Sequence, residues 1–173
     1  MVNRNYTEDF QNNVKVSFEA EKIAKDLLEQ LTWDTFITVR DDPKYFHVGD
    51  LLSSDGKGWD VKDDGVIHRT GNVFCETKKH WKYTGETTDG WMLNGKYDYL
   101  CVLDRIDKNI YVLDFNELKK VYKLYGYSRR GINMGDNYTD GFVLSLCKCR
   151  NLGLLIYEAH YEYDALLDYN FTN

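Results

Sequence analysis

Two aspartates and a lysine in one short stretch have the types and spacing to hold a divalent cation. The stretch, 49–62, reads as two strands joined by a turn at Asp55-Gly56. Alternate side chains of a strand share a face, so Asp60 and Lys62 point the same way. If the turn folds the strands antiparallel, Asp50 lies beside Asp60. Two carboxylates that close repel unless a cation lies between them, and oxygen ligands suit Mg²⁺ (or Mn²⁺).

These residues resemble the core motif of the PD-(D/E)xK nuclease superfamily: an acid at a strand start, nine residues, then Asp-x-Lys. Asp50, Asp60 and Lys62 match it, and Gly49 stands where the proline of the name would be. The most similar members are small Holliday-junction-resolvase-like and phage-type enzymes. The resemblance implies a Mg²⁺-dependent endonuclease or exonuclease acting on DNA. It also implies the backbone carbonyl of Val61 as a further metal ligand.

A helix predicted over 7–31 precedes the motif. Its apolar residues recur at three- and four-residue steps and form one stripe: Ala20, Ile23, Ala24, Leu27, Leu28 and Leu31. Glu21 lies on the edge of this stripe, where a carboxylate either reaches a strand-borne site or is solvated at the core boundary. In the resembled family the first helix carries such a Glu, so Glu21 is a further candidate for the site. Glu19 lies on the opposite edge and is the weaker candidate.

A second acid-x-Lys follows on the strand predicted over 73–79. From the residues alone, Glu76 and Lys78, with Asp64 or Asp60 upstream, are an alternative motif to the first one. In relatives of the resembled family the motif lysine is followed by an acid, then Thr-Gly-Asn, then a strand with a glutamate. The chain reproduces that order with Lys62, Asp64, Thr70-Gly71-Asn72 and Glu76. The resemblance thus implies that Glu76 joins the first site as a catalytic and metal-binding residue.

Basic residues outside the motif are candidates for contacts with substrate phosphates: Arg69, Lys78, Arg129 and Arg130. Arg129 and Arg130 are the best candidates, whereas Arg69 and Lys78 are equally well explained as solvated surface charges. The net charge of −6 argues against a simple basic nucleic-acid binder, although part of the acid excess would lie in the metal site.

The predicted order of a helix and three strands (35–40, 45–52 and 58–62) is that of a restriction-endonuclease-like core. We therefore expect an α/β (α+β) fold, a central mixed sheet flanked by helices, in a single domain over 1–173. Further strands are predicted at 97–103, 109–115, 142–149 and 152–157. A helix capped by Asn116 is expected to run to Tyr125, and a loop over 83–94 is expected to cover the site.

The chain's four cysteines lie in strand-like runs, which predicts buried, reduced thiols. The first residues are polar, and no apolar run approaches the roughly 20 residues that span a bilayer, so we expect a cytoplasmic protein. The spacing of Cys147-Lys148-Cys149 does not fit a zinc knuckle. There is no phosphate-binding G-x-x-x-x-G-K motif and no dinucleotide-binding G-x-G-x-x-G motif.

Two functions remain open at this point. The first is a nuclease whose partner is DNA and which is a homodimer if it cuts two strands. The alternative is a catalytically inactive protein on the same fold, acting as an interaction module or a DNA mimic, which the acidic balance favours.

Overall fold

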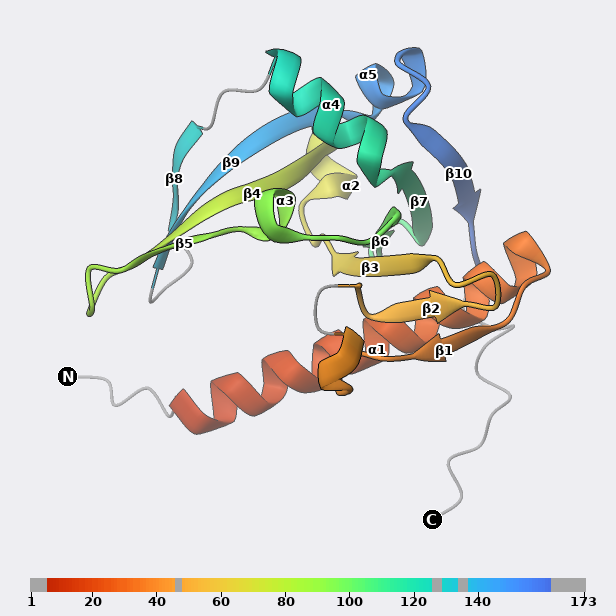
Figure 1. Cartoon of the computed structure of the whole chain (residues 1–173), viewed down its shortest axis with the longest axis horizontal. Coiled ribbons are helices and arrows are strands. Elements are labelled where there is room, and N and C mark those ends of the chain that lie inside the picture. The colour runs from red at the N-terminus through yellow and green to blue at the C-terminus, as the bar shows by residue number, and fades with distance from the viewer. Residues whose placement is uncertain (1–5, 46–47, 126–128, 134–136, 163–173) are drawn as a thin grey trace.

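The computed structural model describes residues 6–45, 48–125, 129–133 and 137–162. A six-stranded mixed sheet lies at the centre, in the order β1-β2-β3-β6-β7-β10 (Figure 1). Its strands are β1 (Phe36–Thr38), β2 (Leu51–Ser53), β3 (Gly58–Asp63), β6 (Tyr99–Asp104), β7 (Asn109–Asp114) and β10 (Leu155–His160). The predicted central mixed sheet flanked by helices is confirmed, as is the helix followed by three strands.

A second, four-stranded sheet extends from one side of the first, in the order β5-β4-β9-β8. Its strands are β4 (Asn72–Trp81), β5 (Thr87–Asp89), β8 (Arg129–Asn133) and β9 (Asn137–Ser145). The helices are α1 (Tyr6–Thr32), α2 (Ile67–Thr70), α3 (Trp91–Asn94), α4 (Phe115–Tyr125) and α5 (Leu146–Asn151), with a 3-10 turn, η1, at Pro43–Tyr45.

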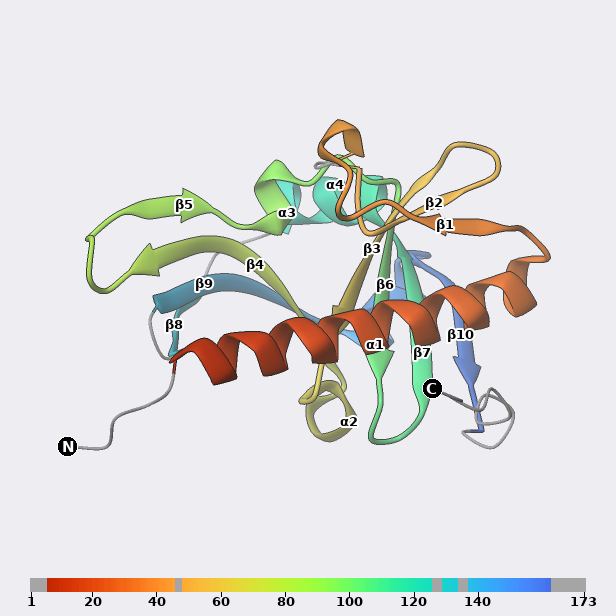
Figure 2. The ribbon, with the colours of Figure 1, turned by 90° about the horizontal axis from the view of Figure 1, so that it is seen from below.

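The long helix α1 covers one face of the central sheet, across the strands β3, β6 and β7 (Figure 2). Its apolar stripe buries Ala20, Ala24 and Leu28 against the sheet. Trp59 and Val61 of β3 belong to the same buried cluster. Because strand side chains alternate, the side chains of Asp60 and Lys62 leave β3 on the opposite face, as the sequence predicts.

The opposite face of the central sheet packs against α4 and the second sheet. Leu100 and Val102 of β6, Phe115 and Leu118 of α4, and Val73 of β4 share one buried cluster there. Strands β3 and β6 run parallel, while the other pairs between described strands are antiparallel. The crossover between β3 and β6 contains β4, β5, α2 and α3. The end of this crossover, with Trp91, Asn94, Gly95 and Tyr97, therefore covers the space beside Asp60.

Several predicted boundaries are wrong. The strand expected over 45–52 is shorter, because η1 occupies its start and β2 begins only at Leu51. The loop expected over 83–94 contains β5 and α3. The cap of α4 is not Asn116, since Asp114 Oδ1 accepts the backbone N–H of Glu117 at 2.9 Å. The strand expected over 142–149 ends at Ser145, whose side chain accepts the backbone N–H of Lys148 and starts α5.

The four cysteines are all unpaired thiols. Cys75, Cys101 and Cys149 are buried, as predicted, whereas Cys147 is exposed on α5. Within the described ranges, none of the helices combines the length and the apolar character needed to cross a bilayer.

Candidate active site

The β2–β3 hairpin brings the two aspartates of the motif together. The regular antiparallel pairing of β2 with β3 ends at Leu51, which pairs with Trp59. The backbone N–H of Asp50 also donates to the carbonyl of Trp59, at 2.8 Å, so Asp50 and Leu51 both lie against Trp59. The hairpin nevertheless brings the carboxylates of Asp50 and Asp60 to one pocket.

Gly49 allows the chain before β2 to lie close to the backbone of β3. Its φ is +120°, and a Cβ on this residue would lie 2.4 Å from the carbonyl oxygen of Trp59. Proline fixes φ near −65°, so it cannot take this conformation. The departure from the proline of the resembled motif thus has a local structural cause.

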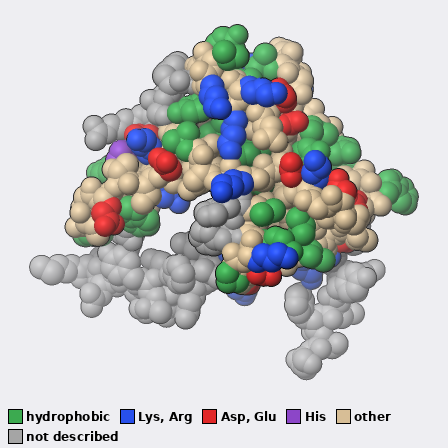
Figure 3. Space-filling model, viewed as in Figure 1, with side chains coloured by type: hydrophobic (Ala, Val, Ile, Leu, Met, Phe, Trp, Pro, Cys, Tyr) green, Lys and Arg blue, Asp and Glu red, His purple; other side chains and the backbone are tan. Residues whose placement is uncertain are grey.

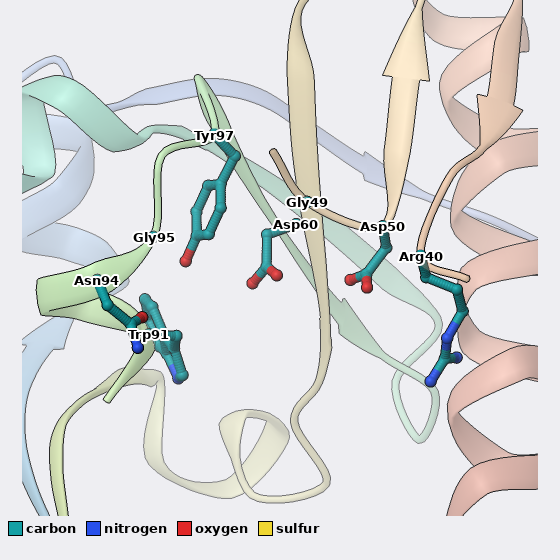
Figure 4. A pocket seen from close by; sticks show the side chains of 8 residues that line it. All are labelled: Arg40, Gly49, Asp50, Asp60, Trp91, Asn94, Gly95 and Tyr97. Carbon is teal, nitrogen blue, oxygen red and sulfur yellow. The ribbon is translucent and has the colours of Figure 1, made fainter. Parts of the chain in front are cut away.

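The two aspartates line a pocket of about 300 Å³, which we call the carboxylate pocket. It is lined by Arg40, Gly49, Asp50, Asp60, Trp91, Asn94, Gly95 and Tyr97. Figure 4 shows the side chains of Asp50 and Asp60 pointing into it from neighbouring strands, with Arg40 on one side and Trp91 and Tyr97 on the other. The pocket therefore has acids at its centre and an aromatic wall.

Asp50 is held by the backbone of β3. Its Oδ2 accepts the N–H of Val61 at 2.8 Å. In a strand the N–H and C=O of one residue point to the same edge, so the Val61 carbonyl leaves β3 on the side where Asp50 lies. The Val61 carbonyl is the metal ligand that the resemblance implies. It lies at the same edge of β3 as the Asp50 carboxylate.

Asp60 and Lys62 form an ion pair on the same face of β3. Lys62 Nζ lies 2.6 Å from Asp60 Oδ2. Burial raises the pKa of Asp60, the Lys62 ammonium opposes this and Asp50 adds to it. For Lys62, burial lowers the pKa, but the carboxylates of Asp60, Asp50 and Glu76 together raise it overall. The neighbouring carboxylates therefore favour the ammonium form of Lys62.

Glu21 lies on the buried side of α1, where it is 4% exposed. Arg40 Nη1 makes a short ion pair with its Oε1, which also accepts the Ser17 hydroxyl at 3.1 Å. Burial and the Asp50 carboxylate raise the pKa of Glu21 to about 7, against the lowering effect of Arg40. Glu21 is thus electrostatically linked to Asp50, but it contacts Arg40 and does not line the carboxylate pocket.

Glu76 lies on β4, across from the motif strand. It lines a second cavity together with Lys62, and its carboxylate raises the pKa of Lys62. Lys79 Nζ lies 3.3 Å from Glu76 Oε1. The structure therefore brings Glu76 to Lys62 but not into the carboxylate pocket with Asp50 and Asp60.

The residues of the alternative motif, Asp64, Glu76 and Lys78, do not all line one pocket. Asp64 Oδ1 accepts the backbone N–H groups of Val66 and Ile67 at the start of α2. It lines the second cavity with Glu76, but Lys78 is exposed and lines neither this cavity nor the carboxylate pocket.

The remaining candidates lie away from the carboxylates. Arg69 is exposed on α2, and Glu19 is 3.7 Å from Arg105 on the outer side of α1. Arg129 and Arg130 belong to β8, but their side chains lie outside the described residues. None of these positions supports or opposes a contact with phosphates.

The donors at this site fit Mg²⁺. In the described ranges no group of three or more His, Cys, Asp or Glu side chains is close enough to form a metal cage. Mg²⁺ does not need such a cage, since it is usually bound by one or two carboxylates, waters and substrate phosphates. Asp50 and Asp60, with the Val61 carbonyl, supply such a set of oxygen atoms.

Three residues of the pocket were not expected at the site: Arg40, Gly95 and Tyr97. Trp91 and Asn94 belong to the segment 83–94, which was expected to cover the site. Arg40 follows β1, and Val39 N–H donates to the Asp50 carbonyl at 2.9 Å. A basic residue after a strand that pairs antiparallel with the motif strand is therefore the signal that indicates Arg40. Tyr97 comes from the end of the crossover, and no local pattern in the sequence indicates that it reaches the pocket.

Comparisons of the chain with protein-family models, with curated proteins and with solved structures found no match.

Proposed function

We propose that this chain is a Mg²⁺- or Mn²⁺-dependent phosphodiester hydrolase that acts on DNA, with Asp50, Asp60 and Lys62 as its catalytic core. The observation that carries the proposal is their arrangement. Two carboxylates from neighbouring strands point into one open pocket, and an ammonium lies 2.6 Å from one of them. This arrangement agrees with the resemblance to PD-(D/E)xK nucleases.

The side chains have separate roles in this reaction. Asp50 and Asp60, with the carbonyl of Val61, would hold the divalent ion, which supplies an activated water and neutralises phosphate charge. The Lys62 ammonium, 2.6 Å from Asp60 Oδ2, stabilises the charge that develops on the phosphate oxygens. Tyr97 lines the carboxylate pocket beside Asp60 and forms part of its aromatic wall.

Glu21 and Glu76 do not contact the reacting atoms in this proposal but act through neighbouring residues. Glu21 holds Arg40 at the edge of the carboxylate pocket, and Arg40 is placed to contact a phosphate there. Glu76 lines the second cavity with Lys62 and adds to the negative charge around its ammonium. Both are positioning residues in this proposal rather than metal ligands.

Local charge supports nucleic acid as the substrate despite the net charge of −6. Lys and Arg side chains gather over α4 and below it, toward the central strands (Figure 3). Lys119, Lys120 and Lys123 belong to α4. Phosphates are bound by such local clusters, whatever the overall charge. Four unpaired cysteines fit a cytoplasmic location, and a homodimer would allow two strands to be cut.

The second candidate is an inactive protein on this fold that serves as an interaction module or DNA mimic. Two ion pairs favour it, because Glu21 is already paired with Arg40 and Asp60 with Lys62. Acids that are neutralised within the protein have less need of a bound cation.

Metal binding and cleavage distinguish the two candidates. We expect Mg²⁺ or Mn²⁺ to raise the melting temperature of the wild type and to support cleavage of plasmid, single-stranded or branched DNA. Asp60→Asn should lose both effects. The matched control is Asp89→Asn, which removes an exposed acid on β5. A folded protein with neither a metal-induced shift nor cleavage would leave the inactive module as the better explanation.

A further inference from the structure

The second cavity has about 560 Å³ of space and lies next to the carboxylate pocket. We call it the Phe74 cavity. Trp91 lines both spaces, and Lys62, which pairs with Asp60, lines the Phe74 cavity. Lys62 Nζ is 5.7 Å from the centre of the Trp91 ring. A molecule whose phosphate lies at Lys62 therefore has its neighbouring atoms at the mouth of the Phe74 cavity.

The wall of the Phe74 cavity is apolar and is fixed by the second sheet. Phe74 and Val143 face each other in the β4–β9 ladder, and both line the cavity. The Phe74 ring covers Gly141, where a Cβ would lie 2.0 Å from the ring. Val143 keeps 39% of its surface exposed. The ring is thus held in place while apolar surface stays open to a ligand.

The polar groups of the Phe74 cavity favour a base over a phosphate. Asp63, Asp64 and Glu76 line it and would repel an anion. Carboxylate and amide oxygens instead accept hydrogen bonds from the amino groups of bases, and Asn72 supplies an amide. Aromatic side chains such as Phe74 and Trp91 offer faces on which an unpaired base stacks.

We propose that the Phe74 cavity binds the base of a nucleotide next to the phosphate held at Lys62. This inference rests on the proposed function and names its substrate class. A base inside a duplex is stacked and paired and does not reach such a cavity unless it is extruded. The substrate is therefore a single strand, such as an end, a flap or a loop, or a strand with an extruded base.

The test uses the shortest single-stranded oligo(dC) that retains full affinity, so that it binds in one register, with one abasic residue moved along it position by position. Wild-type protein is used, in EDTA and again with Ca²⁺, so that binding is read without cleavage. We expect one position at which loss of the base weakens binding about tenfold, the effect of losing one stacked base, while other positions change little.

Substitutions of Phe74 in the cavity wall provide a second test. Phe74→Ala should weaken binding of the intact strand by a similar factor and remove the effect of the abasic residue. Phe74→Leu keeps the packing over Gly141 and tests the stacking alone. Tyr125→Ala removes an exposed aromatic ring on α4 and serves as the control.

The outcomes separate this inference from the proposed function. If the protein cleaves DNA but no position of the abasic residue weakens binding, the base site is rejected and the proposed hydrolase is retained. A position-specific loss of binding without any metal-dependent cleavage would support the base site and reject the hydrolase. No binding of single-stranded DNA, or equally tight binding of an intact duplex with a flat scan, overturns the base site.

Discussion

The carboxylate of Asp50 accepts the backbone N–H of Val61 at 2.8 Å, at the point where β3 continues past the paired part of β2. The Asp50 carboxylate thus accepts the hydrogen bond that a neighbouring strand would otherwise accept from Val61. The contact satisfies a strand N–H and fixes the carboxylate in the plane of the sheet. Asp50 therefore has two roles, one in the hairpin and one in the proposed metal site.

These two roles separate by mutation. Asp50→Asn keeps an oxygen that accepts the Val61 N–H, so we expect the free energy of unfolding to change by less than about 1 kcal/mol. Cleavage should still fall by roughly 10²-fold or more, because a charged ligand is lost. Asp50→Ala should lose cleavage and also about 1 kcal/mol of stability. Urea unfolding and a cleavage assay check both values, and an active Asp50→Asn would contradict the metal-binding role.

Removing Lys62 and removing the charge of Asp60 are expected to change the stability of the protein by different amounts. Lys62→Ala leaves a buried carboxylate without its ammonium and should cost roughly 2 kcal/mol of stability at pH 8. Asp60→Asn removes the buried charge and should be neutral or stabilising, although cleavage is lost. The double variant should recover most of the stability lost by Lys62→Ala. Equal destabilisation by both single changes would show that the contact is mainly a packing interaction.

Gly49 and Gly56 offer a matched pair for the hairpin. Both have positive φ, but a Cβ at Gly49 would clash with the Trp59 carbonyl, whereas nothing lies within 4 Å of one at Gly56. We expect Gly56→Ala to cost about 1–2 kcal/mol from the backbone conformation alone. Gly49→Ala should cost roughly 3 kcal/mol or more and disturb Asp50. Thermal unfolding tests this order, and a Gly49→Ala protein as stable as Gly56→Ala would contradict the close approach.

Glu21 predicts a specific pH dependence of stability. Its pKa is about 7 in the folded protein and 4.5 as an ordinary carboxyl. Between these values the folded state binds more protons, so the contribution of Glu21 falls as pH rises from about 4.5 to 7 and is then constant. The full effect is roughly 3 kcal/mol. The difference in unfolding free energy between wild type and Glu21→Gln, measured from pH 4.5 to 8, isolates this effect. A difference that does not change with pH would contradict the raised pKa.

The sequence predicted the hairpin because its signals are local. Alternation along Trp59, Asp60 and Val61 and the turn at Asp55-Gly56 together fix the face and the register. The stripe on α1 is equally local. Arg40 and Tyr97 were missed because they reach the pocket through strand pairing and a crossover, which no spacing in the sequence records. The helix α5 was read as a strand because its apolar residues are few and its start depends on the Ser145 cap.

The parallel pairing of β3 with β6 has a consequence for how the protein is made. During synthesis Asp50, Asp60 and Lys62 emerge early, whereas their covering residues follow only with α3 and β6, and β9 emerges later still. Until then the aspartates are hydrated, and their mutual repulsion is screened by water. We therefore expect the electrostatic penalty of the acidic pair to arise only when these residues close over it. If the pocket holds a divalent cation as proposed, that cation should accelerate the last phase of refolding and leave the formation of the hairpin unchanged.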